Sequence, residues 1–221
     1  HEGSDGRWHY TLFVENGRIA DRGARRLRAG LSEIARVHEG LFALTNNQNV
    51  TVAGVAAPQR PAREARIREY GLEREVSVLR RNAMACVALP TCALAMAESE
   101  RYLPDLITRL DAVIDACGLA DTPITLRMTG CPNGCARPYI AEIGLVGKAP
   151  GKYNLYLGAG FHGQRLGKLY RENIGEAAIV EALTPLLERY AAERQAGEHF
   201  GDFLVRTGAV PAVAAGRQFH D

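Results

Sequence analysis

The sequence predicts an α+β fold made of two unlike parts, and three observations support this prediction. The chain has 221 residues, which suits one large domain or two small ones. Residues 8–70 alternate between stretches with strand character and stretches with helical spacing, whereas residues 79–221 group short strands between longer helices. We therefore expect a first domain over residues 1–78 and a mixed α/β second domain over residues 79–221.

The first part follows the order strand, helix, strand, helix. Aromatic and β-branched residues predict extended structure at 8–14 and again at 42–55, and Asn16-Gly17 is a strong hairpin-turn signal. Apolar residues at helical spacing predict a helix over 24–38, and a second over 61–70 begins with a proline. This order is typical of helices packed on a small sheet, and it looks like one half of a ferredoxin-like unit.

The second part begins with a segment that has more loop than helix or strand character. Further along, an apolar stripe predicts a helix after Pro104, and Pro185 should kink a later helix or restart it with Thr184 as N-cap. The expected elements are a loop over 80–92, helices over 93–102, 104–117 and 176–194, strands over 124–128, 140–146 and 153–157, and a surface tail over 209–221.

Composition excludes several classes of protein. The chain is 47% hydrophobic and 24% charged, which is ordinary globular usage, and its net charge of +2 does not suggest a nucleic-acid partner. No apolar run approaches the roughly 20 residues that span a bilayer. Residues 1–7 are polar, contain no signal-peptide core and lack an initiator Met. We expect a cytoplasmic protein without a membrane partner, present here as part of a longer chain.

Four of the five cysteines form two spaced pairs. Cys86 and Cys92 have five residues between them, and Cys131 and Cys135 have three. The second spacing puts both thiols on one face if the segment forms a helical turn. Four thiolates suit structural zinc or a [4Fe–4S] cluster. The fifth, Cys117, falls on the apolar stripe of its helix and is expected in the core.

Spacing alone leaves three possibilities for these cysteines: an iron–sulfur cluster, zinc, or unligated redox thiols. Zinc ligands usually stand two to four residues apart, so the wider first pair favours the cluster. Gly130 and Gly134 flank the second pair, and glycine allows backbone to approach a bulky ligand closely. None of the six histidines has metal-ligand spacing with another, and none is assigned to catalysis.

The two cysteine segments resemble the paired cluster motifs of the sirohaem- and [4Fe–4S]-containing sulfite and nitrite reductases. The segments read ACVALPTC over 85–92 and TGCPNGC over 129–135, and NNQN over 46–49 resembles a further segment of the family. Residues 145–157 and 200–203 look most like the haemoprotein (β) subunit of the NADPH-dependent assimilatory enzyme, which serves sulfur assimilation and cysteine biosynthesis. The likeness covers nearly the whole chain and matches only the C-terminal half of such a subunit.

The resemblance implies roles for individual residues. Cys86, Cys92, Cys131 and Cys135 would hold the cluster, and Cys135 would also be the axial ligand of the sirohaem iron. No other catalytic residue is expected in this half. The remaining candidates for cofactor contacts are Asn133, Arg137, Gln48 and Asn49. Asn133 is alternatively a turn residue, Arg137 a solvated surface residue, and the other two part of a polar loop.

The activity implied is the six-electron reduction of sulfite to sulfide. The expected partners are sulfite, a flavoprotein (α) subunit that delivers electrons from NADPH, and the N-terminal half of the same subunit. Because that half would supply the anion-binding cations, we expect this chain alone to be inactive. Two other functions remain open: a ferredoxin-dependent sulfite or nitrite reductase, and a non-catalytic metal-binding domain with four cysteines.

Overall fold

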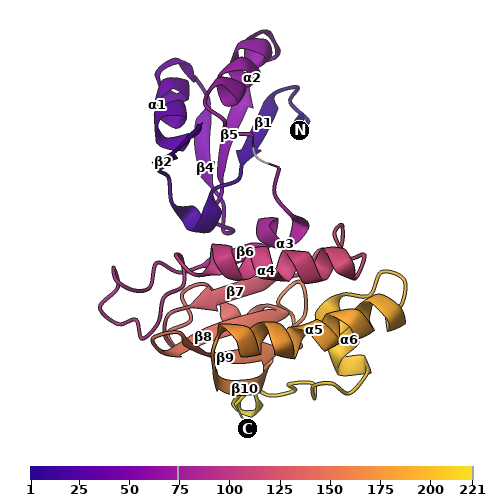
Figure 1. Ribbon diagram of the computed structural model, residues 1–221. Helices are drawn as coiled ribbons and strands as arrows, with labels where there is room; N and C mark the ends of the chain where they lie inside the picture. The colour runs from indigo at the N-terminus through magenta and orange to yellow at the C-terminus, as the bar shows by residue number, and fades with distance from the viewer. Residues whose placement is uncertain (74, 221) are drawn as a thin grey trace. The chain divides into compact units, whose positions relative to one another are not determined.

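The computed structural model describes residues 1–73 and 75–220, and the chain divides into two compact units (Figure 1). The units are His1–Val76 and Ser77–Asp221, so the division falls two residues before the position expected from the sequence. Each unit combines helices with its own sheet, which confirms the predicted α+β class. Among the described residues, no helix is both long enough and apolar enough to cross a membrane.

The first unit is a three-stranded antiparallel sheet covered by two helices. The strand order is β1-β5-β4, and β2 and β3 form a separate two-stranded ladder. The elements are β1 (Trp8–Leu12), η1 (Glu15–Gly17), β2 (Asp21–Arg22), β3 (Arg25–Arg26), α1 (Leu27–Val37), β4 (Leu41–Leu44), β5 (Val50–Val55), η2 (Ala57–Gln59) and α2 (Arg60–Glu69). Asn16-Gly17 lies in a 3-10 turn rather than in a β-hairpin, because β1 pairs with β5 and not with the next strand.

The core of the first unit forms where the apolar stripes of the two helices meet the sheet. Leu27 and Ile34 of α1 and Ile67 of α2 are buried against Val52 and Val55 of β5. These are the positions that helical and strand periodicity predict, since residues three, four or seven apart share one face of a helix.

Arg63 of α2 joins the two helices of this unit. Its side chain is buried, and its guanidinium donates to the carbonyls of Ile34 (3.4 Å) and Val37 (3.2 Å) in the last turn of α1. Carbonyls of the last helical turn have no partner within the helix, so a cation there satisfies them and complements the helix dipole.

We expect Arg63→Met to destabilise the first unit by about 1–3 kcal/mol, because the buried Ile34 carbonyl and the partly buried Val37 carbonyl lose their donor while the apolar stem is kept. Trp8 is the one tryptophan in the sequence and lies in β1, so urea unfolding followed by its fluorescence reports this unit. Arg68→Met, at an exposed position on the same helix, should leave the midpoint unchanged. Equal shifts for both variants would contradict the capping role.

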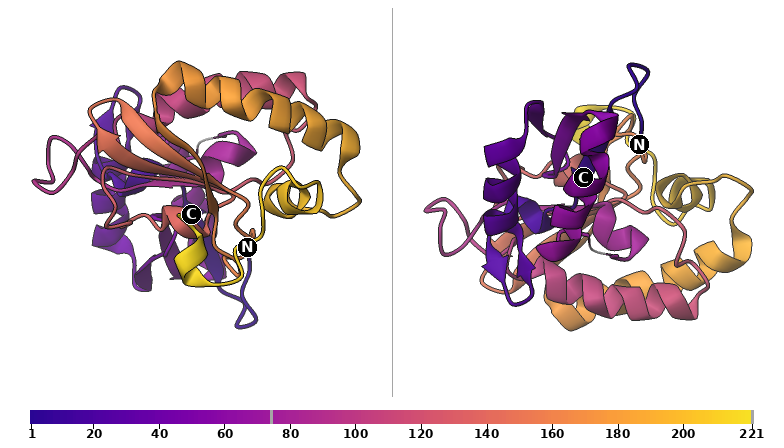
Figure 2. Two further views of the ribbon diagram at one scale, coloured as in Figure 1. Left: turned by 90° about the horizontal axis from the view of Figure 1, so that it is seen from below. Right: turned by 90° about the horizontal axis from the view of Figure 1, so that it is seen from above.

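The second unit is a five-stranded mixed sheet with helices on one side (Figure 2). The order is β10-β9-β8-β7-β6; β6, β7 and β8 run parallel to one another, and β9 runs antiparallel to both of its neighbours, β8 and β10. The elements are α3 (Val78–Arg81), β6 (Ala83–Ala85), α4 (Leu103–Ala116), β7 (Leu126–Thr129), η3 (Pro138–Ile140), β8 (Ile143–Ala149), β9 (Lys152–Leu157), β10 (Lys168–Ile174), α5 (Glu176–Glu193), α6 (Phe200–Arg206) and η4 (Gly216–Gln218).

The two faces of this sheet differ in what covers them. One face carries apolar residues packed into the core with α4, α5 and α6; on the strands these are Ala85, Leu126, Met128, Ile143, Leu145, Leu155 and Leu157. The opposite face carries a row of residues in register across four strands: Met84, Arg127, Gly144 and Tyr156. A Cβ on Gly144 would lie 2.2 Å from the Pro138 carbonyl oxygen, so η3 passes directly over this row.

Several predicted elements of the second unit are wrong. Residues 93–102 form turns instead of a helix, because Met96 and Ala97 donate their N–H groups to a distant carbonyl, that of Gly130. Pro104 lies in the first turn of α4 and so begins this helix. The helix α5 continues through Pro185, and the Thr184 hydroxyl bonds back to the Val180 carbonyl, so Thr184 is not an N-cap.

Candidate functional site

The four paired cysteines lie in loops that begin at the carboxyl ends of neighbouring parallel strands. Cys86 follows β6 directly, and Cys131 comes two residues after β7. Since β6 and β7 are parallel and in register, their carboxyl ends meet at one edge of the sheet. Open α/β sheets bind ligands at this edge, where the loops converge.

Gly130 holds the two cysteine loops together. Its N–H lies 3.3 Å from the Cys86 sulfur and donates to it, and its carbonyl accepts from the N–H groups of Met96 (2.8 Å) and Ala97 (3.1 Å). Next to it, the Met128 carbonyl accepts from the Cys86 N–H at 3.1 Å. An N–H group directed at a sulfur that ligates an iron–sulfur cluster tunes the reduction potential of that cluster.

Contact between the loops explains why glycine is needed here. A Cβ on Gly130 would lie 2.6 Å from the Ala88 Cβ and 2.6 Å from the Ala97 carbonyl oxygen. A Cβ on Gly147 would lie 2.4 Å from the Gly130 carbonyl oxygen. The close approach that Gly130 allows in this structure is therefore between protein segments, since protein atoms occupy the space that a side chain would need.

The second cysteine pair lies in two successive turns, so the predicted helical turn is wrong. Gly134 donates to the Cys131 carbonyl, and Arg137 donates to the Gly134 carbonyl at 2.7 Å. Gly134 has a φ of +67°, a left-handed conformation that interrupts an α-helix and favours glycine. The Tyr139 hydroxyl bonds to the Pro132 carbonyl at 3.0 Å and fixes the first turn.

None of the four cysteines forms a disulfide, and their side chains differ in exposure. Cys131 is buried, Cys86 and Cys92 are half-buried, and Cys135 is exposed. Within residues 1–73 and 75–220, no three His, Cys, Asp or Glu side chains converge as they would around a single metal ion. A [4Fe–4S] cluster has four separate irons, each bound by its own thiolate, so its ligands surround a larger volume than those of zinc.

Cys117 is separate from this edge of the sheet. It is the C-cap residue of α4, partly buried against the apolar core, and burial raises the pKa of its thiol. A raised thiol pKa disfavours the thiolate that binds metals. The structure therefore agrees with a packing role, although Cys117 lies at the rim of the core.

The other predicted cofactor contacts fall in both units. In the second unit, Asn133 is exposed between the second pair of cysteines, and Arg137 is half-buried with its guanidinium 3.8 Å from the Met84 sulfur. In the first unit, Gln48 and Asn49 lie in the β4–β5 turn. The Asn49 side-chain oxygen accepts from the Val14 N–H at 2.9 Å, so Asn49 also has a structural role within its unit.

Sequence reasoning missed two charged residues of the second unit, Arg127 in the middle of β7 and Glu142 at the opposite end of the sheet from the cysteine loops. Arg127 is half-buried in the middle of β7; burial lowers its pKa, and the nearby charge of Arg137 adds to the shift. Glu142 is fully buried and accepts from the N–H groups of Gly201 and Thr125, both at 2.8 Å. The sequence does contain a signal for Arg127, because it is a charged residue between the apolar residues Leu126 and Met128 of a strand.

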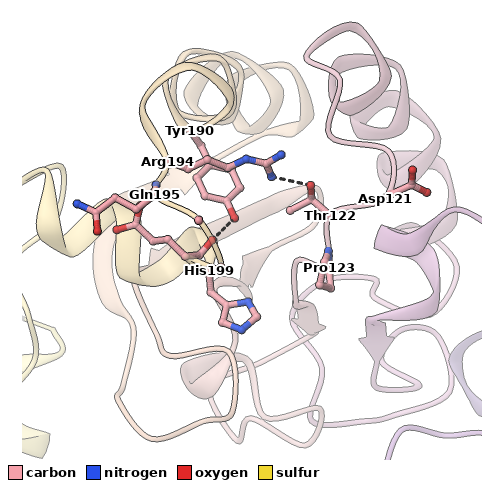
Figure 3. A pocket seen from close by; sticks show the side chains of 10 residues that line it. Asp121, Thr122, Pro123, Tyr190, Arg194, Gln195 and His199 are labelled. Carbon is pink, nitrogen blue, oxygen red and sulfur yellow. Dashed lines mark hydrogen bonds between the residues drawn. The ribbon is translucent and has the colours of Figure 1, made fainter.

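Hollows elsewhere in the second unit include one at the α5–α6 connection and one beside the first cysteine loop. One of about 450 Å³ lies at the α5–α6 connection (Figure 3), where Arg194 donates to the Thr122 hydroxyl at 2.7 Å and Tyr190 donates to the Glu198 carbonyl at 2.6 Å. The other, of about 680 Å³, borders the first cysteine loop at Leu89 and Pro90. Only the second adjoins a candidate ligand loop.

The chain is similar to known proteins over its whole length. Over its whole length the chain is 60% identical to the sulfite reductase [NADPH] hemoprotein beta-component of Afipia carboxidovorans and 58% identical to that of Bacillus subtilis. The chain is homologous to part of the sulfite reductase hemoprotein. It spans 38% and 39% of the length of these two relatives. The resemblance inferred from the cysteine motifs is thereby confirmed.

The similarity to sulfite reductase hemoproteins extends to both units. Residues 1–70 match the family model described as the nitrite/sulfite reductase ferredoxin-like half domain, which agrees with the expected nature of the first unit. The fold also matches the Mycobacterium tuberculosis NirA protein, with a TM-score of 0.75 at 22% identity over 93% of this chain and 39% of that one. Dissimilatory sulfite reductase I matches with a TM-score of 0.62 at 13% identity, over 91% of this chain and 67% of that one.

Proposed function

We propose that this chain is the part of a sulfite reductase that holds a [4Fe–4S] cluster and one side of a sirohaem. The observation that carries the proposal is the convergence of two cysteine loops at the carboxyl edge of β6 and β7, joined by the Gly130 N–H on the Cys86 sulfur. Homology to sulfite reductase hemoproteins supports the reaction, the six-electron reduction of sulfite to sulfide.

The residues present fit an iron–sulfur cluster in chemical type. Thiolates are the ligands that such clusters require, and Cys86, Cys92, Cys131 and Cys135 would supply all four. Cys135, which is exposed, would also be the residue that holds the sirohaem iron. When bound, the cluster would supply electrons singly and the haem iron would bind sulfite.

The residues of this chain would hold the ligand cysteines in position and contact the edge of the haem. Cys131 is buried, the loops pack closely around Gly130, and the Gly130 N–H donates to the Cys86 sulfur, so this part of the ligand set is held in a fixed position. Asn133 and Arg137 from this unit, and Gln48 and Asn49 from the first, are the proposed contacts to the haem periphery. An arginine fork suits the carboxylates of such a macrocycle.

The rest of a longer subunit is the proposed partner of the first unit. The strand β4 lies at the edge of its sheet, and all four of its residues are exposed; Leu41 and Leu44 are 63% and 82% exposed. A hydrophobic edge strand without charges is the kind of surface that another strand or layer covers. Because that partner would supply the anion-binding cations, we expect the chain alone to show no sulfite turnover. A flavoprotein subunit that draws on NADPH is the proposed electron donor.

Anaerobic reconstitution with ferrous iron and sulfide tests the proposal. We expect the chain to take up about four irons and four sulfides with a broad charge-transfer absorption. Alanine at Cys86, Cys92, Cys131 or Cys135 should lower the iron content severely, because each iron of the cluster needs its own thiolate. The matched control is Cys117→Ala, which should keep the full content.

Three outcomes would count against the cluster. Wild-type chain that is folded by circular dichroism and binds no iron would refute it. Stoichiometric zinc in place of iron would assign the cysteines to a structural metal site. Equal loss of iron in Cys117→Ala and in the four other variants would show that uptake is not site-specific.

A further inference from the structure

Tyr139 of η3 contacts the segment between Cys131 and Cys135 at more than one point. Its hydroxyl donates to the Pro132 carbonyl at 3.0 Å. Its ring packs on the backbone of Gly134, because a Cβ on that glycine would lie 3.0 Å from the ring carbon Cε2. Burial raises the pKa of Tyr139, and a thiolate charge on Cys131 adds to the shift, so the phenol also lies near this sulfur. A single side chain therefore spans the segment that separates the two cysteines.

The ring of Tyr139 is held in turn by two other aromatic rings. Tyr156 of β9 meets it edge to face, with ring centroids 5.2 Å apart and planes at 89°. Phe219, from the segment predicted as a surface tail, meets it at 5.2 Å and 76°. Edge-to-face pairs at this separation are favourable beyond the apolar area that they bury. The buried Tyr156 belongs to the sheet, whereas Phe219 reaches the cluster from an otherwise exposed segment.

Hydrogen bonds fix residues 218–220, here called the tail strap, along β10 and β9. The Leu169 N–H donates to the Phe219 carbonyl at 2.9 Å. The Tyr156 hydroxyl and the Nδ1 atom of His220 lie 3.1 Å apart, at hydrogen-bond distance. Exposed segments near a chain end keep much of their freedom unless such bonds hold them. The bonds of the tail strap therefore keep the Phe219 ring in the aromatic cluster.

We propose that the tail strap acts through Tyr139 to hold the second cysteine loop closed over the Cys131 thiol. Tyr139 is then a positioning residue for the cysteines, and the tail strap keeps its ring in place. The loop needs such support because it consists of two successive turns, and Gly134, at a φ of +67°, adds backbone freedom. The inference rests on the proposed function only where it gives the held cysteines a role as ligands.

Alkylation of the metal-free 221-residue chain by iodoacetamide, followed at each cysteine by mass spectrometry, tests the proposal. Because Cys131 is buried, it reacts only when its surroundings open, and its rate reports the population of the open form. We expect Tyr139→Phe to speed the alkylation of Cys131 roughly two- to tenfold, since the variant keeps the ring and loses one hydrogen bond. Phe219→Ala should speed it at least as much, because the Tyr139 ring loses a neighbour.

Two control variants separate local opening of the loop from a general loss of stability. Ile179→Val, in the core below α5, removes one buried methylene and destabilises the second unit about as much as the loss of one hydrogen bond does. Tyr170→Phe removes the same hydroxyl from a tyrosine of β10 that packs against the core of the unit. We expect both controls to leave the Cys131 rate at the wild-type value.

A double variant tests whether the tail strap acts through Tyr139. Tyr139→Met keeps apolar volume and removes both the ring and the hydroxyl, and its Cys131 rate should exceed that of Tyr139→Phe. Adding Phe219→Ala to Tyr139→Met should change the rate by less than about twofold, because the ring that Phe219 contacts is already absent.

Three results would overturn the proposal. An unchanged Cys131 rate in Tyr139→Phe or in Phe219→Ala would show that the contact does not hold the loop. Equal acceleration in Ile179→Val would show that Cys131 reacts through general unfolding of the unit. A full additional effect of Phe219→Ala in the Tyr139→Met background would show that the tail acts independently of Tyr139. Alkylation requires no metal, so its outcome is separate from iron uptake, which tests the proposed function.

Discussion

Gly130→Ala is expected to prevent iron–sulfide incorporation and to destabilise the second unit. The added methyl would lie 2.6 Å from the Ala97 carbonyl oxygen, and this backbone atom cannot move without displacing the first cysteine loop. Overpacking of this kind costs about 1–3 kcal/mol. The same displacement would break the bond from the Gly130 N–H to the Cys86 sulfur and separate the two ligand pairs.

Urea unfolding and iron analysis after reconstitution check this expectation. The control is Gly216→Ala, because a Cβ there meets no atom within 4 Å. We expect the control to bind iron normally and to unfold at the wild-type midpoint. Normal iron content in Gly130→Ala would show that the loops adapt independently, and the role given to their contact would then be wrong.

The second large effect concerns Glu142, whose carboxyl group makes stability depend on pH. Burial raises the pKa of Glu142 to about 7, and hydrogen bonds from the Gly201 and Thr125 backbone oppose the shift without cancelling it. The unfolded chain ionises this group near its ordinary value of 4.5. The folded state therefore holds a proton that the unfolded state releases between these two values.

The contribution of Glu142 to the free energy of unfolding is therefore fully present below pH 4.5 and is lost as the pH rises to about 7. At about 1.4 kcal/mol per pKa unit, the loss is on the order of 3 kcal/mol. Glu142→Gln should flatten this part of the pH dependence, because it has no proton to release. It should also lower stability at pH 5, since its amide NH₂ would face either the Gly201 or the Thr125 N–H.

Urea unfolding at several pH values from 5 to 8 measures both effects. Glu181→Gln, at an exposed position on α5, removes the same charge and should follow the wild-type curve. Parallel curves for wild type and Glu142→Gln would show that another group causes any pH dependence. In that case the raised pKa assigned to Glu142 would be wrong.

Local patterns in the sequence predicted those elements whose hydrogen bonds are local. The helix expected over 104–117 is α4 (Leu103–Ala116), because its apolar stripe repeats at helical spacing and its bonds run within the segment. Residues 93–102 have the composition of a helix, yet Met96 and Ala97 donate to Gly130. The strand β6 has only three residues and no alternating pattern; it forms because β7 pairs with it.

The sequence by itself identified the chemistry of the candidate site. Four cysteines in two spaced pairs, with Cys117 on a helical stripe, predict the candidate ligands without reference to the fold, and the family resemblance favours an iron–sulfur cluster over zinc or unligated thiols. Only the tertiary structure decided how the loops meet. Parallel pairing of β6 and β7 brings both pairs to one edge and places Arg127 beside Arg137. Those contacts join residues far apart in the chain, and periodicity within a short segment carries no information about them.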